Sequence, residues 1–470
     1  MTCGRKPQRC PVTPLAPFGS LSSGRSSGGP LLRISRPFGA KQARRYWAEE
    51  LQATRIDTGG VVREARGTWH GQLADHFELT GEVDETRFGR LVEGQHPTTG
   101  ETLVRHRPPC RYRQPGGRLT TTMGHRAGWD ATFSAPKSVS LTALVGGDER
   151  VRQAHQAALA AALRELEPFV EANRNAPRRE TTGNWLAALF EHDSARPVQG
   201  YEAPQLHTHV LIFNLTQTAE GRIRPLESWE LFRSQSFATA VYRSDLAMRL
   251  REAGYAIEHG PSGQPEIRGY TAAYLKASSP RRQQIETYLD RHRQRGPQAA
   301  QIAAYRTREP KARCPREDME RRHRTLAELF GGEAARVVRA AHARDARVEL
   351  ALPTIPPDLA IAYAGARVFE GHMVVDERQI LRHALRLSMG DVSLQDLRQG
   401  FERRVAAGEF IAVERTRGTA GKTYALRETL MRDPAAMAFD LDGLATSPPA
   451  HDVALRLPSA RHEQSLGLGG

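Results

Sequence analysis

The stretch LHTHVLIF at residues 206–213 places two histidines two positions apart within a run of apolar residues. Alternate residues of a β-strand point to opposite faces of its sheet, so the pattern predicts a strand with His207 and His209 on one face. Such a strand must be packed on one side while it presents imidazoles on the other. Two neighbouring imidazoles can chelate a divalent ion, although an isolated H-x-H pair is more often a pair of ordinary surface or core histidines.

A third histidine ends the preceding strand-like stretch. His192 closes NWLAALFEH (184–192), and a loop over residues 193–206 is expected between it and His207. If the two strands pair in antiparallel fashion, His192 completes a three-histidine site with open positions for a substrate oxygen. The residues alone leave open whether the histidines bind a metal or are structural.

A carboxylate lies in another alternating stretch, GWDATFS (128–134), where Asp130 shares a strand face with Thr132 and Ser134. A carboxylate in a segment otherwise built for burial needs a partner. A metal-bound histidine commonly donates its second ring N–H to a carboxylate, which would give Asp130 such a partner. The alternative is a helix N-cap or an ion pair with Arg126.

Two further segments have the chemistry to act on a phosphate. The sequence SAPK (134–137) predicts a helix start, where free backbone N–H groups and Lys137 would hold an anion. Tyr46 follows Arg44 and Arg45 in a predicted helix. A phenol has a pKa of about 10, so neighbouring positive charge would help it act as a nucleophile. From the residues alone, a tyrosine in this setting is far more often an ordinary helix tyrosine.

The charge of the chain favours a polyanionic partner. Its 470 residues carry a formal net charge of +14. Residues 1–46 contain nine Lys or Arg and no acid, and residues 281–350 contain 17 basic and 10 acidic residues. Such concentration suits the release of counterions from nucleic acid. No apolar run reaches the roughly 20 residues needed to span a bilayer, and the four widely spaced cysteines predict a reducing, cytosolic setting.

Five stretches, in this order, carry a family resemblance: ISRPFGAKQARRYWAEEL, HRAGWDATFSAPKSVSLTALVGGDERV, ETTGNWLAALFEHDSARPV, PQLHTHVLIFN and YRSDLAMRLREAGYAIE. Over residues 31–310 the chain resembles the relaxase domain of MobF-type conjugative relaxases, the TrwC/TraI-like family. The resemblance implies an α+β fold with an antiparallel sheet, the HUH endonuclease type. By position it makes His192, His207 and His209 the metal ligands, Asp130 the acid beside the metal, and Tyr46 the nucleophile. It also matches Arg196 to a basic residue that contacts a phosphate.

The activity implied by the resemblance is metal-assisted nicking of single-stranded DNA at an origin of transfer. The ion would be Mg²⁺ or Mn²⁺, with Zn²⁺ as an alternative. The tyrosine would form a 5′-phosphotyrosyl link in the bacterial cytoplasm, and a separate helicase and conjugation accessory proteins would be partners. A truncated origin-binding helper that does not cut, or a rolling-circle replication initiator, remains the alternative.

The sequence also predicts how the chain is divided. Helices are expected at 150–173 and at 236–255, the second ended by Gly254, and a linker at 353–358. Leu32 falls where family members commonly begin, which suggests a start site assigned too far upstream. The expected segments are a disordered extension (1–30), the relaxase domain (31–310), a basic helical connector (311–352), a winged-helix-like domain that is a remnant of a helicase start (353–432), and a disordered tail (433–470).

Two departures from the family pattern limit the expected activity. The family often has a second tyrosine downstream of the first, but residues 53–60 read ATRIDTGG. Termination through a second tyrosine is therefore in doubt. Residues 418–423 (GTAGKT) resemble a P-loop, but Thr416 stands where the first glycine is required, and the segment falls in a predicted hairpin turn. No ATPase activity is expected.

Overall fold

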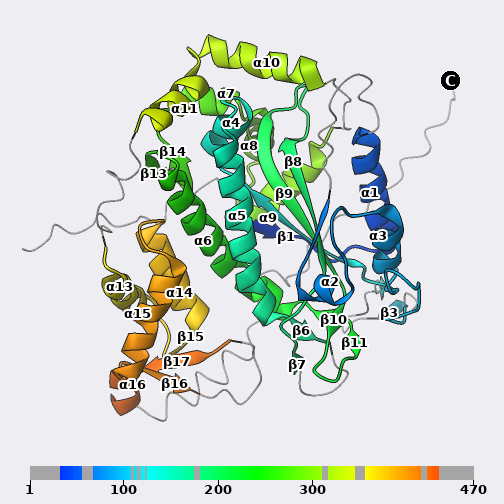
Figure 1. Ribbon diagram of the computed structural model, residues 1–470, viewed down its shortest axis with the longest axis vertical. Helices are drawn as coiled ribbons and strands as arrows, with labels where there is room; N and C mark the ends of the chain where they lie inside the picture. Colours follow the sequence, from blue (N-terminus) through cyan, green and yellow to red (C-terminus); the bar gives the residue numbers. More distant parts are fainter. Residues whose placement is uncertain are drawn as a thin grey trace, which may run out of the picture.

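The fold is taken from a computed structural model of the chain (Figure 1). The residues it describes are 32–54, 67–106, 111–113, 117, 119–121, 124–173, 180–309, 316–344, 355–413 and 421–432. The disorder expected for 1–30 and 433–470 lies outside these residues. Within them, no helix is both long enough and apolar enough to cross a bilayer.

A five-stranded antiparallel sheet forms the centre of the molecule. Its strands, in spatial order, are β1 (Leu32–Ile34), β5 (Gly128–Ser134), β9 (Pro204–Phe213), β8 (Ala187–Ser194) and β2 (Thr68–His70). The mixed helix and antiparallel-sheet class expected from the sequence is thus confirmed. The loop expected over 193–206 is shorter, because β8 continues to Ser194, which pairs with Pro204 across a register shift.

Helices cover both faces of this sheet (Figure 1). On one face lie α5 (Glu149–Leu166) and α6 (Trp229–Glu252), which bury the odd-numbered residues of β5 and the even-numbered residues of β9. On the other face lie α1 (Ala40–Thr54), α2 (Gln72–His76) and α3 (Glu85–Val92). Each large apolar side chain buried here stabilises the fold by about 1.5–3 kcal/mol. Successive residues of these strands therefore pack alternately into two hydrophobic cores, one on each face of the sheet.

Two helix boundaries differ from expectation. The helix expected from residue 236 begins at Trp229, and its end before Gly254 agrees with the sequence, since Gly254 has φ +85°. The helix expected over 150–173 stops at Leu166 and is followed by a 3₁₀ turn, η1 (Glu167–Phe169). The SAPK segment does begin a helix, α4 (Lys137–Leu144), with Pro136 as its N-cap residue.

Short strands and helices complete this part of the chain. The strands are β3 (Arg111–Arg113), β4 (Leu119–Thr121), β6 (Glu171–Ala172), β7 (Glu180–Thr181), β10 (Thr216–Gln217), β11 (Ile223–Arg224), β12 (Leu226–Glu227), β13 (Ile257–His259) and β14 (Pro265–Ile267). The helices are α7 (Ala272–Ala277), α8 (Pro280–Arg291), α9 (Pro297–Arg306), α10 (Arg316–Leu329) and α11 (Glu333–Ala343). Helices α10 and α11 pack on the body of the molecule: Ala327 joins a buried cluster with Leu141 and Tyr274.

The C-terminal part combines helices with a small sheet. It contains α13 (Pro357–Phe369), β15 (Val374–Asp376), α14 (Glu377–Ser388), α15 (Leu394–Ala406), β16 (Phe410–Val413), β17 (Thr423–Leu426) and α16 (Arg427–Arg432), with sheet order β15-β17-β16. The linker expected over 353–358 is wrong at its end, because α13 starts at Pro357, a residue suited to the first helical position. The winged-helix assignment stays a prediction.

Candidate active site

The three histidines singled out in the sequence lie on one face of the sheet. His192 of β8 stands directly opposite His207 of β9, and His209 stands two positions further along β9. The ring centres of the three side chains are 5.2 Å apart in every pair. Three imidazole nitrogens, each about 2.1 Å from one tetrahedral ion, would place the ring centres about 5 Å apart. The spacing of the rings therefore suits a shared ion.

Hydrogen bonds orient two of these rings. His209 Nδ1 lies 2.8 Å from one carboxylate oxygen of Asp130 and 3.0 Å from the other. Thr132 donates to the same carboxylate at 3.3 Å. His207 Nδ1 lies 2.9 Å from the carbonyl oxygen of Gln205 and donates its proton there. With Nδ1 as the proton-bearing atom in both rings, the lone pair of each ring lies on Nε2, the atom that a metal-binding role would use.

Burial keeps the His207 imidazole in the neutral form that binds metals. The pKa of His207 is lowered to about 3, chiefly because burial penalises its charged form, and further because His209 and His192 lie beside it. A histidine must be neutral to donate a lone pair to an ion. His207 is therefore ready for coordination at neutral pH.

Tyr46 reaches the same face from helix α1. Its hydroxyl lies 3.3 Å from His192 Nε2, and its ring centre is 5.6 Å from that of His209. The ring of Phe190 contacts Tyr46 edge-on at 6.2 Å, and Trp47 packs the neighbouring turn of α1 against Phe88. The aromatic packing of α1 thus holds a phenol oxygen beside the histidines.

The types of side chain at this site suit a divalent ion, although their donor atoms do not converge on one point. No group of three or more His, Cys, Asp or Glu side chains among the described residues has its donor atoms gathered in a metal-binding geometry. His192 Nε2 is in contact with the Tyr46 hydroxyl and would have to exchange that contact for an ion. The neutral ring of His207, the spacing of the three rings and the Asp130 carboxylate behind His209 are the features that fit.

Comparison with known proteins identifies the family of the chain. A family model described as TrwC relaxase matches residues 40–330. The chain belongs to the TrwC relaxase family. Two proteins named multifunctional conjugation protein TraI are relatives: one from Escherichia coli is 37% identical over 214 residues, and one from strain K12 is 32% identical over 252 residues. These matches cover 43% and 51% of this chain but only 11% and 13% of the relatives.

Solved structures of conjugative relaxase TrwC in complex with oriT DNA share the fold. A metal-free complex aligns with a TM-score of 0.52 and a copper-bound complex with a TM-score of 0.54, both at 28% identity. Each alignment covers 64% of this chain and 98% of the TrwC chain. More than a third of this TrwC-family member therefore lies outside the part aligned with those structures.

The basic residues expected to contact DNA in this TrwC-family chain lie in different settings. Arg44 bonds to Glu93 at 3.2 Å and to the carbonyl of Gly89 at 3.1 Å, so it ties α1 to α3. Arg45 is exposed on α1, and Arg196 is half-buried in the loop after β8. Arg45 and Arg196 thus keep contact with solvent.

The Lys137 ammonium is turned toward the protein. It donates to the carbonyl oxygen of Pro204 at 2.7 Å, and burial lowers the pKa of Lys137 to about 7. The geometry favours a positioning role, in which Lys137 holds the start of β9.

A buried polar chain behind the sheet was not foreseen from the sequence. His155 of α5 lies between the hydroxyls of Tyr242 (2.7 Å) and Thr208 (2.9 Å). Thr208 stands between the two histidines of β9 but points to the opposite face. The sequence did contain a signal for these hydrogen bonds: His155 lies on the apolar stripe of an Ala-rich helix. A polar side chain buried there needs hydrogen-bond partners.

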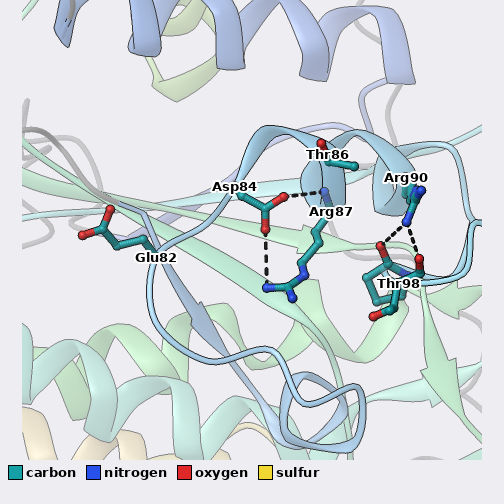
Figure 2. A pocket seen from close by; sticks show the side chains of 7 residues that line it. Glu82, Asp84, Thr86, Arg87, Arg90 and Thr98 are labelled. Carbon is teal, nitrogen blue, oxygen red and sulfur yellow. Dashed lines mark hydrogen bonds and ion pairs between the residues drawn. The ribbon is translucent and has the colours of Figure 1, made fainter.

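A hollow beside α3 is distinct from the histidine site, and none of the histidines lines it. Figure 2 shows Asp84, Arg87 and Arg90 of its lining turned toward their own neighbours. Asp84 accepts from the backbone N–H of Arg87 at 2.9 Å, and Arg90 donates to the carbonyls of Pro97 and Thr98. These side chains stabilise the turn around α3 and leave little chemistry for a ligand.

Proposed function

We propose that this chain nicks one strand of DNA at an origin of transfer, with Tyr46 as the nucleophile and His192, His207 and His209 as ligands of a divalent ion. The observation that carries the proposal is the Tyr46 hydroxyl on the face where the three imidazoles meet, 3.3 Å from His192 Nε2. The TrwC structures in complex with oriT DNA support the choice of substrate.

The reaction is a transesterification at one phosphate. The phenol of Tyr46 gives up its proton, and its oxygen forms a bond to phosphorus as the bond from phosphorus to the 3′ oxygen breaks. That 3′ oxygen takes up one proton, so protons balance and the strand end is left as a free 3′-hydroxyl. A 5′-phosphotyrosyl link keeps the energy of the phosphodiester, which makes rejoining possible.

The residues around the phenol determine when it can react. Without an ion, His192 Nε2 is the base within reach of the hydroxyl proton. When His192 serves as a ligand, its lone pair is committed, so the hydroxyl would turn toward a phosphate and pass its proton to solvent. A bound Mg²⁺ or Mn²⁺ would stabilise the negative charge that develops on the phosphate oxygens.

Substrate binding would use the exposed basic side chains. Arg45 and Arg196 are proposed to contact the strand near the scissile phosphate, and the arginines of helices α8 to α10 to contact the flanking strand. No step in the reaction uses ATP, and Thr423 of the P-loop-like segment begins strand β17, where a nucleotide site would require a helix. A helicase and accessory proteins would be separate partners.

Cleavage of a supercoiled plasmid that carries the cognate origin tests this function. With Mg²⁺ or Mn²⁺ the wild-type chain is expected to produce open-circular DNA, and EDTA or His209→Ala is expected to abolish the product. His259→Ala is the matched control, because His259 is an exposed histidine on β13, away from the three-histidine site. Origin binding without any open-circular product would instead favour a helper that does not cut.

A further inference from the structure

Helices α6 and α14 lie side by side and run parallel (Figure 1). Their contacts advance together along both helices: Ser234 meets Arg378, Ser236 meets Arg382, and Ser244 meets Gly390. Arginines recur on α14 at every fourth position, so Arg378, Arg382 and Arg386 follow one line along this junction. The three differ in what neutralises them.

The first arginine of the line is fully matched by acids. Arg378 bonds to Glu230 at 2.8 Å and to Asp376 at 2.5 Å, and all three side chains are nearly inaccessible to solvent. Its guanidinium also lies 4.1 Å from the ring centre of Phe169. This is the arrangement expected where a buried arginine has a purely structural role.

Arg382 and Arg386 of this line, together with Arg243 of α6, differ from Arg378 in their partners. Arg382 donates to the Ser236 hydroxyl at 3.2 Å and contacts His383 Nε2 at 3.1 Å, while Arg243 of α6 donates to the carbonyl of Ser262 at 2.8 Å. The Nε atoms of Arg243 and Arg382 are buried without a hydrogen-bond partner. Within the described residues, neither of these arginines nor the exposed Arg386 forms an ion pair with a carboxylate.

The arginines act on one another as uncompensated like charges. Burial, reinforced by the charge of Arg386, lowers the pKa of Arg243 to about 10 and also lowers the pKa of Arg382. Burial and the charges of Arg382, Arg386 and Arg367 lower the pKa of His383 to about 4. Gathering cations without a counter-charge is unfavourable unless an anion joins them.

We propose that Arg243, Arg382 and Arg386, here named the α6–α14 arginine cluster, bind phosphates of the DNA backbone at a second site outside the nicking centre. Guanidinium groups bind phosphate oxygens through paired, charge-assisted hydrogen bonds. The choice of DNA as the source of phosphate rests on the proposed function and on the net charge of +14.

The location determines which part of the DNA would be bound. Helix α6 covers the sheet face opposite the histidines, so the strand at the scissile phosphate does not reach this cluster. The cluster joins the body of the molecule to the C-terminal part, because Arg243 comes from α6 and the other two arginines come from α14. A DNA segment distant from the cleavage site would therefore bridge these two parts.

Salt-dependent binding of two fluorescein-labelled probes tests the proposal. One is a 12-nucleotide strand around the cleavage site and the other a 60-nucleotide strand with its flanking sequence. For Arg386→Ala, the dependence of log K on log salt for the long probe is expected to weaken by about 0.7, and for Arg382→Ala/Arg386→Ala by about 1.4. Cleavage of the short probe is expected to stay at the wild-type rate.

Two controls distinguish the loss of a phosphate contact from a general effect of charge removal or misfolding. Arg403→Ala removes the same charge from an exposed arginine of α15 that already pairs with Asp358 at 3.0 Å, and it should leave both probes unaffected. Since Arg386 is exposed, its replacement should not impair folding, which circular dichroism checks. Wild-type affinity and salt dependence for Arg386→Ala and the double variant would overturn the proposal.

A free anion is distinguished from DNA by a thermal-shift titration with inorganic phosphate. Arginine-dependent stabilisation by phosphate, without any change in binding of the long probe, would contradict the assignment to DNA. If the wild-type chain failed to cleave the short probe while the long probe still showed the arginine-dependent slope, the proposed nicking would fail and this site would stand.

Discussion

The Asp130 carboxylate determines which nitrogen of His209 faces the site. It lies 2.8 Å from Nδ1, so that atom carries the proton and Nε2 keeps its lone pair. The backbone N–H of Asp130 donates to the Ser35 hydroxyl at 2.9 Å, which fixes the strand that carries the carboxylate. Asp130 thus acts through His209 as a positioning residue.

Asp130→Asn should weaken binding of Mn²⁺ by about 10- to 100-fold, because an amide gives His209 a poorer and less basic partner. Isothermal titration calorimetry measures the affinity directly, without reference to nicking. Asp193→Asn is the matched control: Asp193 lies one residue beyond His192 and pairs with Arg152 at 2.9 Å on the α5 side of the sheet. Equal Mn²⁺ affinity in wild type and Asp130→Asn would show that Asp130 does not support a ligand.

At this scale the sequence predicted the grouping well. The spacing of two within β9 and the alternation of β5 put His207, His209 and Asp130 on one face, as the structure has them. Their neighbours were harder to foresee. The partner of His207 is a backbone carbonyl, and Lys137 turns to the Pro204 carbonyl. Every residue type has a backbone carbonyl, so no pattern of residue types predicts these hydrogen bonds.

At the scale of elements, β9 is held from behind by helix α5. His155 spans from Tyr242 of α6 to Thr208 of β9 and is fully buried. Burial and the charge of Arg152 lower the pKa of His155 to about 3, so the ring is neutral in the folded chain. The histidine therefore links two helices to the strand that carries the proposed ligands.

His155→Leu should lower the free energy of unfolding by about 2–4 kcal/mol, because it leaves the hydroxyls of Tyr242 and Thr208 buried without a partner. Urea denaturation followed by circular dichroism gives the value. The exposed His259→Leu should change it by less than about 0.5 kcal/mol. A loss for His155→Leu no larger than that of the control would contradict this structural role.

The same histidine contributes to the pH dependence of stability. Its folded pKa of about 3 lies below its ordinary value of 6.5, so the unfolded chain binds a proton more readily between these pH values. Its contribution is present above pH 6.5 and is lost as the pH falls toward 3. The His155→Leu variant should accordingly lose less stability than wild type over that interval.

Local pattern predicted the strands of the sheet but not all element ends. The start of α6 at Trp229 was missed because its first turns contain Glu230 and Ser234, which have the character of surface residues. Both are buried, and Arg378 satisfies them from more than a hundred residues away. The extension of β8 to Ser194 depends on pairing with Pro204 beyond a register shift, which the alternation of the residues does not predict.

At the scale of the whole molecule, the C-terminal part is joined to the body by a buried ion-pair network. Arg378 connects Glu230 of α6 with Asp376 at the start of α14, and Arg398 of α15 pairs with Glu165 of α5. Gly390 has φ +80°, and a Cβ there would lie 2.7 Å from Ala247 of α6. The C-terminal part is therefore packed closely against the body, while its assignment as a winged-helix-like domain stays a prediction.

Arg378→Ala should destabilise the chain by about 3 kcal/mol, because it leaves two buried carboxylates with only the more distant Arg233 as a counter-charge. The comparison variant Arg403→Ala breaks an exposed pair and should cost at most about 1 kcal/mol. Denaturant unfolding of both variants measures the difference. Similar stabilities would show that the network does not hold the C-terminal part in place.

Mapping of the covalent adduct shows whether Tyr46 is the residue that attacks DNA. The wild-type chain is incubated with Mn²⁺ and a single-stranded oligonucleotide that contains the cleavage site, and is then digested and examined by mass spectrometry. A nucleotide attached through its 5′ phosphate to the peptide that contains Tyr46 is expected, and Tyr46→Phe should form none. An adduct on another residue, or cleavage that persists in Tyr46→Phe, would contradict the account.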